Sequence, residues 1–469
     1  MQIDRASRRR DDWTPEIIGS SQPRYLAIAD AIAGDLGAGR LAEGDRLPPQ
    51  RQLAARLGLD FTTVARGYTE AQRRGLIAST VGRGTYVNAA PRPVERAPVR
   101  RRSIVDFSMN MPPEPDDPAL LERMRAGLEE VGRDLVTHLR YQGFGGSGAD
   151  KDAATSWLGR RALVPAHERL FVTPGAHPAM QGILATLTRP GDVILAETLT
   201  YPGVRALAAQ AGLRVEGLPA DAEGIDPDAL DAACRRLQPK LLYLNPTLLN
   251  PTTETIAAPR RAAIAEVVRR NRLPILEDDA YGFIPRRGPP PFAALVPELT
   301  WHIAGLAKCL GAGLRVAYVI APDARSALPF VQVARAGTVM ASPLTIALAT
   351  RWIEDGTADA MLRAIRSESM ERQKLAAALL PPGSFLADPI GFHLWLKLPA
   401  PWTRSAFLGH MRLRGVGIVA SDAFTVSGAP PEAVRVCLGG PAEREAVAEA
   451  LAEMAHALGE SPTLASAYL

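Results

Sequence analysis

The chain has 469 residues, of which 47% are hydrophobic, so it is too long for one ordinary domain and we expect two or three domains with sizeable cores. No apolar run reaches membrane-spanning length, and the start, MQIDRASRRRDDW, lacks an apolar signal segment, which argues against a membrane or secreted protein. The three cysteines, Cys234, Cys309 and Cys437, are scattered without metal-type spacing, and we expect reduced residues of a cytoplasmic protein.

The net charge of +4 is distributed unevenly along the chain. Residues 1–102 contain 18 Arg against 11 Asp and Glu, a net charge of +7, and the remainder contains 36 Lys and Arg against 39 acidic residues, a net charge of −3. A basic head on a mildly acidic body indicates that the head meets a polyanion.

The basic head contains three predicted helices. In RYLAIADAIAGDLGAGRL (residues 24–41) apolar residues recur at helical spacing, and Gly37 marks the expected end. A short second helix is predicted in LPPQRQLAARLGL, and a third in FTTVARGYTEAQRRGLI after a tight turn. The run IASTVGRGTYV then predicts two short strands. This order of elements indicates a winged helix-turn-helix domain over residues 20–88.

The third helix has one apolar and one polar face. Three of its side chains are expected to pack inward, namely Val64, Tyr68 and Ala71. The opposite face, at the end where recognition helices meet base edges, carries Thr62, Thr63 and Arg66. Arg51 is expected to hold a phosphate, and Arg83 at the wing tip to reach a minor groove or the DNA backbone. The alternative is a protein-interaction module with solvated arginines.

The run GDRLPPQRQLAARLGLDFTTVARGYTEAQRRGLI, followed by VGRGTYV, resembles the GntR family of bacterial regulators. The resemblance implies that the head binds an operator in double-stranded DNA. Family members often carry Ser-Arg just before the recognition threonines, whereas this chain has Asp60 and Phe61. The family's usual arginine contact to a base therefore has no counterpart at Phe61, and Thr62, Thr63 and Arg66 are expected to contribute more.

Residues 89–105 are rich in proline and arginine and predict an extended, semi-rigid, basic linker. From residue 106 to 469, apolar strand-like runs such as DVILAE, LPILEDD and RVAYVIAP alternate with helical segments. This pattern predicts an α/β body with a largely parallel sheet, divided into a large lobe (about 140–330) and a small lobe (about 331–469). Ligands of such folds bind at the carboxyl ends of the strands.

Lys308 lies in the glycine-rich loop GLAKCLGAGLR, which has no other polar side chain before Arg315. The chain has only four other lysines, at positions 151, 240, 374 and 397, because arginine is its usual cation. A buried lysine can lose its proton and act as an amine nucleophile, which arginine cannot do. A solvated surface lysine is the alternative.

Other polar residues follow the predicted strands. Gly175, Ala176 and His177 stand where a strand becomes a helix. The amides and helix dipole there, together with the cation of Arg315, suit a phosphate group. Tyr201 lies in a loop, where its side chain can cover a flat ring. Each of these residues also has an ordinary structural role available, as a cap, a turn former or part of the core.

The same set supplies the remaining partners of pyridoxal phosphate. Lys308 provides the amine that forms a Schiff base with the aldehyde. Asp278 provides the anion that keeps the ring nitrogen protonated, and Asn250 and Tyr281 provide donors to the phenolate oxygen. The combination therefore predicts a pyridoxal phosphate site.

The motifs TPGAH, TYPG, NPTT, EDDAY and K-x6-R give residues 106–460 a resemblance to the fold-type I, aspartate-aminotransferase-like enzymes. The resemblance implies that Arg435 of AVRVCLGG holds a substrate carboxylate. It also implies that Tyr141 of RYQGFGG reaches the phosphate in the neighbouring subunit of a homodimer. Two departures stand out. Family members often have serines just before the lysine, whereas this chain has Gly305, Leu306 and Ala307. The family's NPTG motif is NPTT here, so Thr253 replaces the glycine.

A GntR-type head joined to such a body is similar to the MocR-type regulators. The resemblance implies a DNA-binding transcriptional regulator that senses an amino compound, with a carboxylate group, through external aldimine formation on pyridoxal phosphate. Two alternatives stay open. The first is an active aminotransferase that the head tethers or autoregulates. The second is a regulator that has lost the cofactor and keeps the body as a dimer scaffold.

Overall fold

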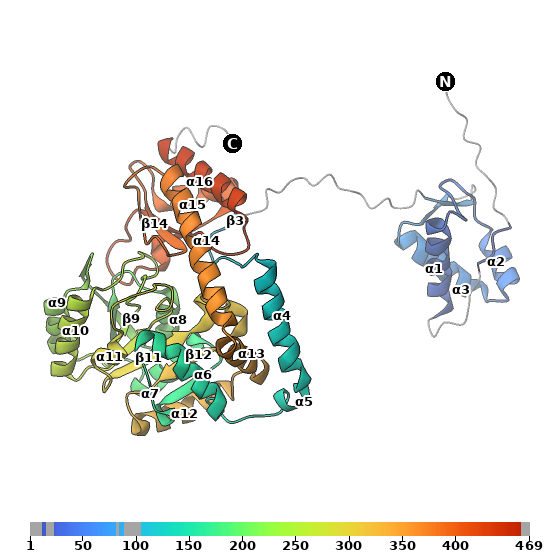
Figure 1. Cartoon of the computed structure of the whole chain (residues 1–469). Helices are drawn as coiled ribbons and strands as arrows, with labels where there is room; N and C mark the ends of the chain where they lie inside the picture. The colour runs from blue at the N-terminus through green and yellow to red at the C-terminus, as the bar shows by residue number, and fades with distance from the viewer. Residues whose placement is uncertain (1–11, 16–22, 81–83, 89–104, 461–469) are drawn as a thin grey trace. The chain divides into compact units, whose positions relative to one another are not determined.

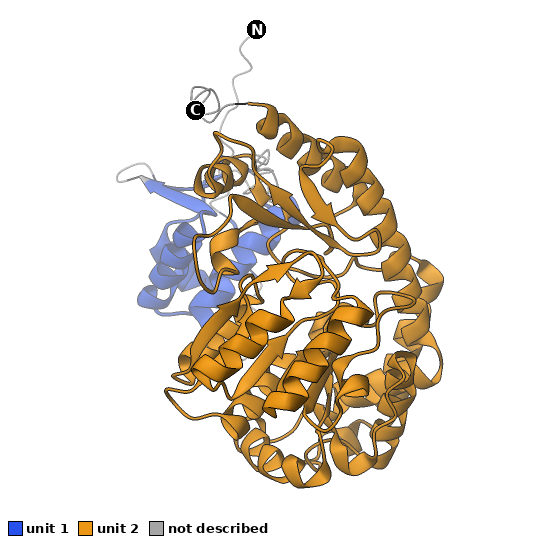
Figure 2. Cartoon of the chain, turned by 90° about the vertical axis from the view of Figure 1, so that its left-hand side faces the viewer, with its two compact units in different colours: residues 1–101 blue, residues 102–469 orange. Residues whose placement is uncertain are grey.

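The computed structural model describes residues 12–15, 23–80, 84–88 and 105–460. The chain forms two compact units, residues 1–101 and 102–469, which Figure 2 shows in blue and orange. Arg83 and nearly all of the predicted linker lie outside the described residues. Within the described ranges, no helix combines the length and the apolar character that a membrane span requires.

The head packs three helices and a hairpin around one apolar core (Figure 1). Its elements are α1 (Arg24–Gly37), α2 (Gln50–Leu57), α3 (Phe61–Arg73), β1 (Ile77–Thr80) and β2 (Gly84–Val87), with β1 and β2 antiparallel. Val64, Tyr68 and Ala71 are buried, so the inward face of α3 is as predicted. The head is thus a winged helix-turn-helix, which confirms the prediction for this part of the chain.

A seven-stranded sheet forms the centre of the body (Figure 1). Its order is β4 (Leu170–Thr173), β12 (Ala317–Ile320), β11 (Thr300–Gly305), β10 (Ile275–Asp278), β9 (Leu241–Leu244), β5 (Val193–Glu197) and β6 (Arg214–Leu218). The neighbours pair in parallel except β12, which runs antiparallel to β11 and β4. The sheet is largely parallel as predicted, but the strand in RVAYVIAP is not, because residues 306–316 are too few for a parallel crossover.

Helices cover both faces of this sheet, because alternate residues of each strand point to opposite sides. One face carries α7 (Ala176–Leu187), α8 (Pro202–Gln210) and α12 (Ala324–Thr338). The other face carries α9 (Pro227–Leu237), α10 (Ala258–Asn271) and α11 (Phe292–Leu295). Next to β4 and β12 this second layer continues with α4 (Pro118–Arg133), α6 (Gly148–Leu158) and α13 (Pro343–Glu354). Short elements complete the large lobe: α5 (Leu135–His138), β7 (Ala220–Asp221) and β8 (Gly224–Ile225).

The small lobe is built on a second sheet and three helices. Its strands, in order, are β13 (Phe385–Ala387), β14 (His393–Lys397), β17 (Ala433–Cys437) and β16 (Val419–Ala420), all antiparallel. The helices are α15 (Arg404–Leu413), α16 (Arg444–Gly459) and the end of α14 (Thr357–Leu379). The start of α14 packs in the large lobe instead, so this helix joins the two cores.

The first described residues after the linker belong to the small lobe. β3 (Val105–Asp106) pairs in parallel with β15 (Val416–Gly417), and the fully buried Phe107 packs into the small-lobe core. Phe107 is also hydrogen-bonded on both sides, because its N–H donates to Gly417 O at 2.8 Å and its carbonyl accepts from Cys437 N at 3.0 Å. The chain therefore enters the body on the small lobe.

One close helix contact gives a stability prediction. A Cβ added at Gly127 of α4 would lie 2.6 Å from Nε1 of Trp352, a buried residue of α13. Gly127→Ala should lower the free energy of unfolding of the body by about 1–2 kcal/mol, because overpacking outweighs the gain of about 1 kcal/mol in helix propensity. Gly409→Ala in α15, where a Cβ meets open space, is the control and should be neutral or stabilising. Urea unfolding of both variants checks this, and equal effects would contradict the packing.

Candidate functional site

A cavity of about 530 Å³ lies at the carboxyl ends of the central strands and is closed on one side by the small lobe. This volume is in the range of small-molecule and cofactor sites. The structure brings ten of the predicted residues into its lining: Gly175, Ala176, His177, Tyr201, Asn250, Asp278, Tyr281, Lys308, Arg315 and Arg435. Tyr141 does not line this pocket, and its side chain is 87% exposed.

Lys308 ends a short 3-10 turn (Leu306–Lys308) that directly follows β11. Its ammonium group donates a hydrogen bond to the carbonyl of Asn110. Burial lowers the pKa of Lys308 to about 8, because the charged form loses its hydration. A substantial fraction of this amine is therefore neutral near physiological pH, as an attack on an aldehyde requires.

Asp278 ends β10 on the floor of the pocket. Its Oδ2 accepts a hydrogen bond from Tyr243 Oη at 3.0 Å, whereas its buried Oδ1 has no partner among the described residues. Burial raises the pKa of Asp278 to about 6, so the carboxyl group is still mainly ionised at neutral pH. A protonated ring nitrogen would supply the partner that Oδ1 lacks.

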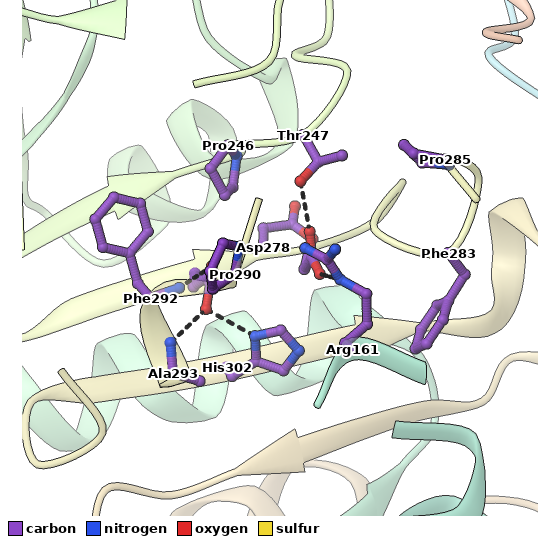
Figure 3. Close-up of polar contacts among 12 residues, drawn as sticks. Arg161, Pro246, Thr247, Asp278, Phe283, Pro285, Pro290, Phe292, Ala293 and His302 are labelled. Carbon is purple, nitrogen blue, oxygen red and sulfur yellow. Dashed lines mark hydrogen bonds and ion pairs between the residues drawn. The ribbon is translucent and has the colours of Figure 1, made fainter. Parts of the chain in front are cut away.

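The two acidic neighbours of Asp278 have partners of their own. Figure 3 labels these partners: Arg161, Thr247, Phe292, Ala293 and His302. Asp279 accepts hydrogen bonds from Thr247 Oγ1 at 3.0 Å and from Arg161 Nε at 3.1 Å. Burial opposes the ionisation of Asp279, but nearby positive charges, that of Arg161 foremost, together with the Thr247 hydrogen bond outweigh burial and hold its pKa below the usual value. Glu277 accepts from His302 Nδ1 at 2.8 Å and from the amides at the start of α11, at 2.7 and 3.0 Å.

The NPTT loop holds Asn250 beside Arg435. Arg435 lies in β17, is 5% exposed, and donates from Nη1 to Asn250 Oδ1 at 3.2 Å. Thr253 takes the place of the family's glycine with φ of 70°, a left-handed conformation that favours glycine, and its N–H donates to Leu249 O at 2.7 Å. The loop thus keeps a glycine-type turn with a β-branched residue.

The opposite end of the pocket is the start of α7. Gly175 precedes this helix with φ of 98°, and a Cβ there would lie 3.0 Å from Nη2 of Arg315. The absence of a side chain thus leaves room for the guanidinium group beside the free amides of the helix N-terminus, a combination that suits an anion. His177 Nε2 and Tyr201 Oη are 3.0 Å apart, so these two predicted residues contact each other.

One part of the pocket was missed by sequence reasoning. Ser108, Met109, Asn110 and Met111 line it, and the carbonyls of Ser108 and Asn110 accept hydrogen bonds from Arg435 and Lys308. Asn110 also donates from Nδ2 to Tyr281 Oη at 2.8 Å. The run MNMP contains no motif that predicts this role. The position of the segment depends on its contacts with the small lobe, which lies far away in the sequence.

These residues fit pyridoxal phosphate. The unpartnered carboxylate oxygen of Asp278 faces a cavity that also holds a lysine of lowered pKa and an amide-rich helix start beside an arginine. When bound, the cofactor supplies an aldehyde for amines and an electron-withdrawing ring. Gly305 and Ala307 also line the pocket, so the wall next to Lys308 offers backbone and methyl groups where family members often have serines.

The candidate DNA-binding residues lie at the start of α3 and α2. Thr62 and Arg66 are exposed and Thr63 is half-buried. The guanidinium group of Arg66 stacks on the ring of Tyr25 at 4.3 Å, and that of Arg51 lies 5.8 Å from the ring centre of Phe61. Thr62 and Arg66 are thus accessible at the start of α3, and both arginines lie near aromatic rings.

Comparison with known proteins matches both units. Residues 102–451 match the family model "Aminotransferase class I and II", and residues 24–87 match "Bacterial regulatory proteins, gntR family". The chain belongs to the aminotransferase class I and II family and carries a GntR-type DNA-binding domain at its head. It is therefore a transcriptional regulator with an aminotransferase-like body. Membership of the aminotransferase family implies that the body binds pyridoxal phosphate.

Individual relatives have the same two-part organisation or the same body fold. The HTH-type transcriptional regulator YdeF of Bacillus subtilis is 28% identical over 94% of this chain and 95% of its own length. The vitamin B6 salvage pathway repressor PtsJ of Salmonella typhimurium is 27% identical over 88% of this chain and 93% of its own. The α-aminoadipate aminotransferase LysN of Thermus thermophilus has the same fold, with a TM-score of 0.69, 22% identity, and coverage of 78% of this chain and 94% of that one.

The lowered pKa of Lys308 gives a pH prediction. Pyridoxal phosphate followed by borohydride should label Lys308, at a rate that rises about tenfold per pH unit up to about pH 8 and then levels, because only the neutral amine reacts. Peptide mapping by mass spectrometry at several pH values measures this. Lys374, exposed and paired with Glu371 at 2.7 Å, is the internal reference. Preferential labelling of Lys240 or Lys374, or a rate still rising at pH 10, would contradict the assignment.

Proposed function

We propose that the body senses a small amino acid or related amino compound with a carboxylate group, and that this binding alters the affinity of the head for its operator. The supporting observation is that one segment, residues 107–111, contacts both Arg435, which would bind the ligand's carboxylate, and Lys308, which would hold the cofactor. The carbonyl of Ser108 accepts from Arg435, and the carbonyl of Asn110 accepts from Lys308. The same segment follows directly on the linker to the head.

Electrostatics favour a carboxylate at Arg435. Its guanidinium group is buried, and its partners, the Asn250 side chain and the Ser108 carbonyl, are both neutral. A ligand carboxylate offers the charge that these partners lack and forms stronger, charge-assisted hydrogen bonds. It would therefore compete with the Ser108 carbonyl for Arg435.

A movement of the small lobe would be transmitted along the chain to the linker. Residues 105–107 are fixed to the small lobe by β3 and by the buried Phe107, and residue 104 belongs to the linker. A change in the position of the small lobe would therefore displace the end of the linker that joins the body. Couplings of this kind typically amount to about 1–3 kcal/mol.

The regulator would act in the bacterial cytoplasm, where operators are accessible.

The residues that line the pocket would have separate roles. Lys308 would hold the cofactor, Asp278 would fix its ring nitrogen, and Arg315 with the start of α7 would take its phosphate. Asn250 and Tyr281 would orient the ring oxygen.

The polar residues of the head would divide the work of DNA binding in the same way. Thr62 and Thr63 with Arg66 would contact bases at the start of α3. Arg51 would hold a phosphate of the DNA backbone, a contact that positions the head and carries no sequence information.

We further propose a homodimer in which Tyr141 serves the partner's pocket. Exposed apolar side chains gather on one stretch of chain, from the end of α4 through α5: Leu128, Leu135, Val136, Leu139 and Tyr141. A second copy of the chain would bury them, since such a concentration of apolar surface marks an interface.

The coupling is tested on cofactor-loaded protein with amino compounds and a duplex selected by the protein from random DNA. Compounds that change the cofactor absorbance should alter operator affinity about 5–150-fold, measured by fluorescence anisotropy. Arg435→Ala should bind carboxylate compounds about 10–100-fold more weakly. The control Arg214→Ala, an exposed arginine of β6, should keep full coupling.

Two results would count against the sensor. One is a spectral response to amino compounds with unchanged operator affinity in every case. The other is steady conversion of an amino donor and a keto acid into products with no effect on DNA binding, which would favour the enzyme instead.

The dimer is tested by its mass. Light scattering at micromolar concentration should give twice 50.2 kDa for the wild type. Leu139→Glu should shift the mass towards that of one chain, because a charge is buried without a partner. Val164→Glu, at an apolar residue that is 79% exposed outside this stretch, is the matched control. A monomeric wild type, or equal effects of both variants, would refute the proposed surface.

A further inference from the structure

Phe61 is an unusual residue for a protein surface. It is the first residue of α3, and its side chain is 44% exposed. Among the described residues of the head it is the one large apolar side chain that is exposed, since the others pack into the core or are partly buried. The ring contributes little to the head's core and stands at the end of the recognition helix that approaches base edges in helix-turn-helix proteins.

Two neighbours of Phe61, Asp60 and Thr62, are hydrogen-bonded to each other. The side chain of Asp60 caps α3 and accepts from Thr62 N at 2.7 Å, and it also accepts from the Thr62 hydroxyl. Thr63 is half-buried. The start of the helix is thereby fixed, and its first exposed group is an aromatic ring rather than a free donor.

An arginine lies beside the ring. The guanidinium group of Arg51, near the start of α2, lies 5.8 Å from the centre of the Phe61 ring, within the range of a cation–π contact. Arg66, five residues further along α3, is exposed, and its guanidinium group lies over the ring of Tyr25 instead. A ring with a cation beside it, at the start of the helix that meets base edges in helix-turn-helix proteins, fits DNA as its partner rather than another apolar protein surface.

A phenyl ring cannot form hydrogen bonds with base edges. In the major groove the one apolar group that distinguishes a base is the 5-methyl group of thymine. We propose that Phe61 is a specificity-determining residue that contacts a thymine methyl group in each bound half-site. This inference rests on the DNA-binding function of the head and adds the base that Phe61 selects.

The test compares thymine with uracil, which differ only by this methyl group. The full-length protein selects duplexes from two random libraries, one with thymine and one with deoxyuridine in its place. Thymine should be enriched at one position of the half-site in the first library, and the preference should vanish in the second. In the selected duplex, replacing that thymine by deoxyuridine should weaken binding about fourfold per half-site, the effect of one buried methyl-sized group.

Three variants make the comparison specific. Phe61→Ala should bind the thymine and deoxyuridine duplexes equally well, and Phe61→Leu should retain part of the difference because it keeps an apolar side chain. Arg66→Ala is the matched control on the same helix. It should weaken binding to both duplexes while the ratio of their affinities stays about fourfold.

Two outcomes would overturn the proposal: equal affinity of the wild type for thymine and deoxyuridine at every position, or a thymine preference that persists in Phe61→Ala. Failure of the DNA-binding function itself looks different, because then neither library yields an enriched sequence. Circular dichroism of Phe61→Ala verifies that the head is folded, as the exposure of this side chain leads us to expect.

Discussion

The site depends on three consecutive carboxylates buried at the end of one strand. Burying a carboxylate is costly unless it is paired. Because side chains alternate along a strand, Asp278 points to the side opposite to Glu277 and Asp279. Glu277 is satisfied by His302 and by amides of α11, and Asp279 by Arg161 and Thr247. Asp278 is left with one hydrogen-bond partner and one free oxygen in the pocket, so the fold itself keeps an anion available there.

The small lobe completes the pocket and also holds the chain where it enters the body. Arg435 and the segment 107–111 come from or are fixed to that lobe, whereas Lys308, Asp278 and Asn250 belong to the large lobe. A ligand that engages both sets would change the position of one lobe relative to the other. The linker ends where β3 pairs with β15 of the small lobe. Any such change would therefore act on the segment that leads to the head.

The sequence was informative where chemistry is local. Lys308 in a loop almost free of polar side chains, Asp278 after a buried strand and the helix start at Gly175 could be placed in one pocket, because parallel strands bring their carboxyl ends together. The antiparallel direction of β12 and the carbonyls of Ser108 and Asn110 could not be predicted in this way. They depend on a loop's length and on how two distant parts of the chain pack, and neither leaves a motif.

The central claim is that ligand and operator binding are coupled through one chain, and coupling between two binding sites is reciprocal. The most direct measurement is therefore the affinity of the cofactor-loaded protein for an effective amino compound, from the cofactor absorbance, with and without a saturating operator duplex. The account predicts that the duplex changes this affinity by the same factor by which the compound changes operator affinity. An affinity that is the same with and without the duplex would contradict it.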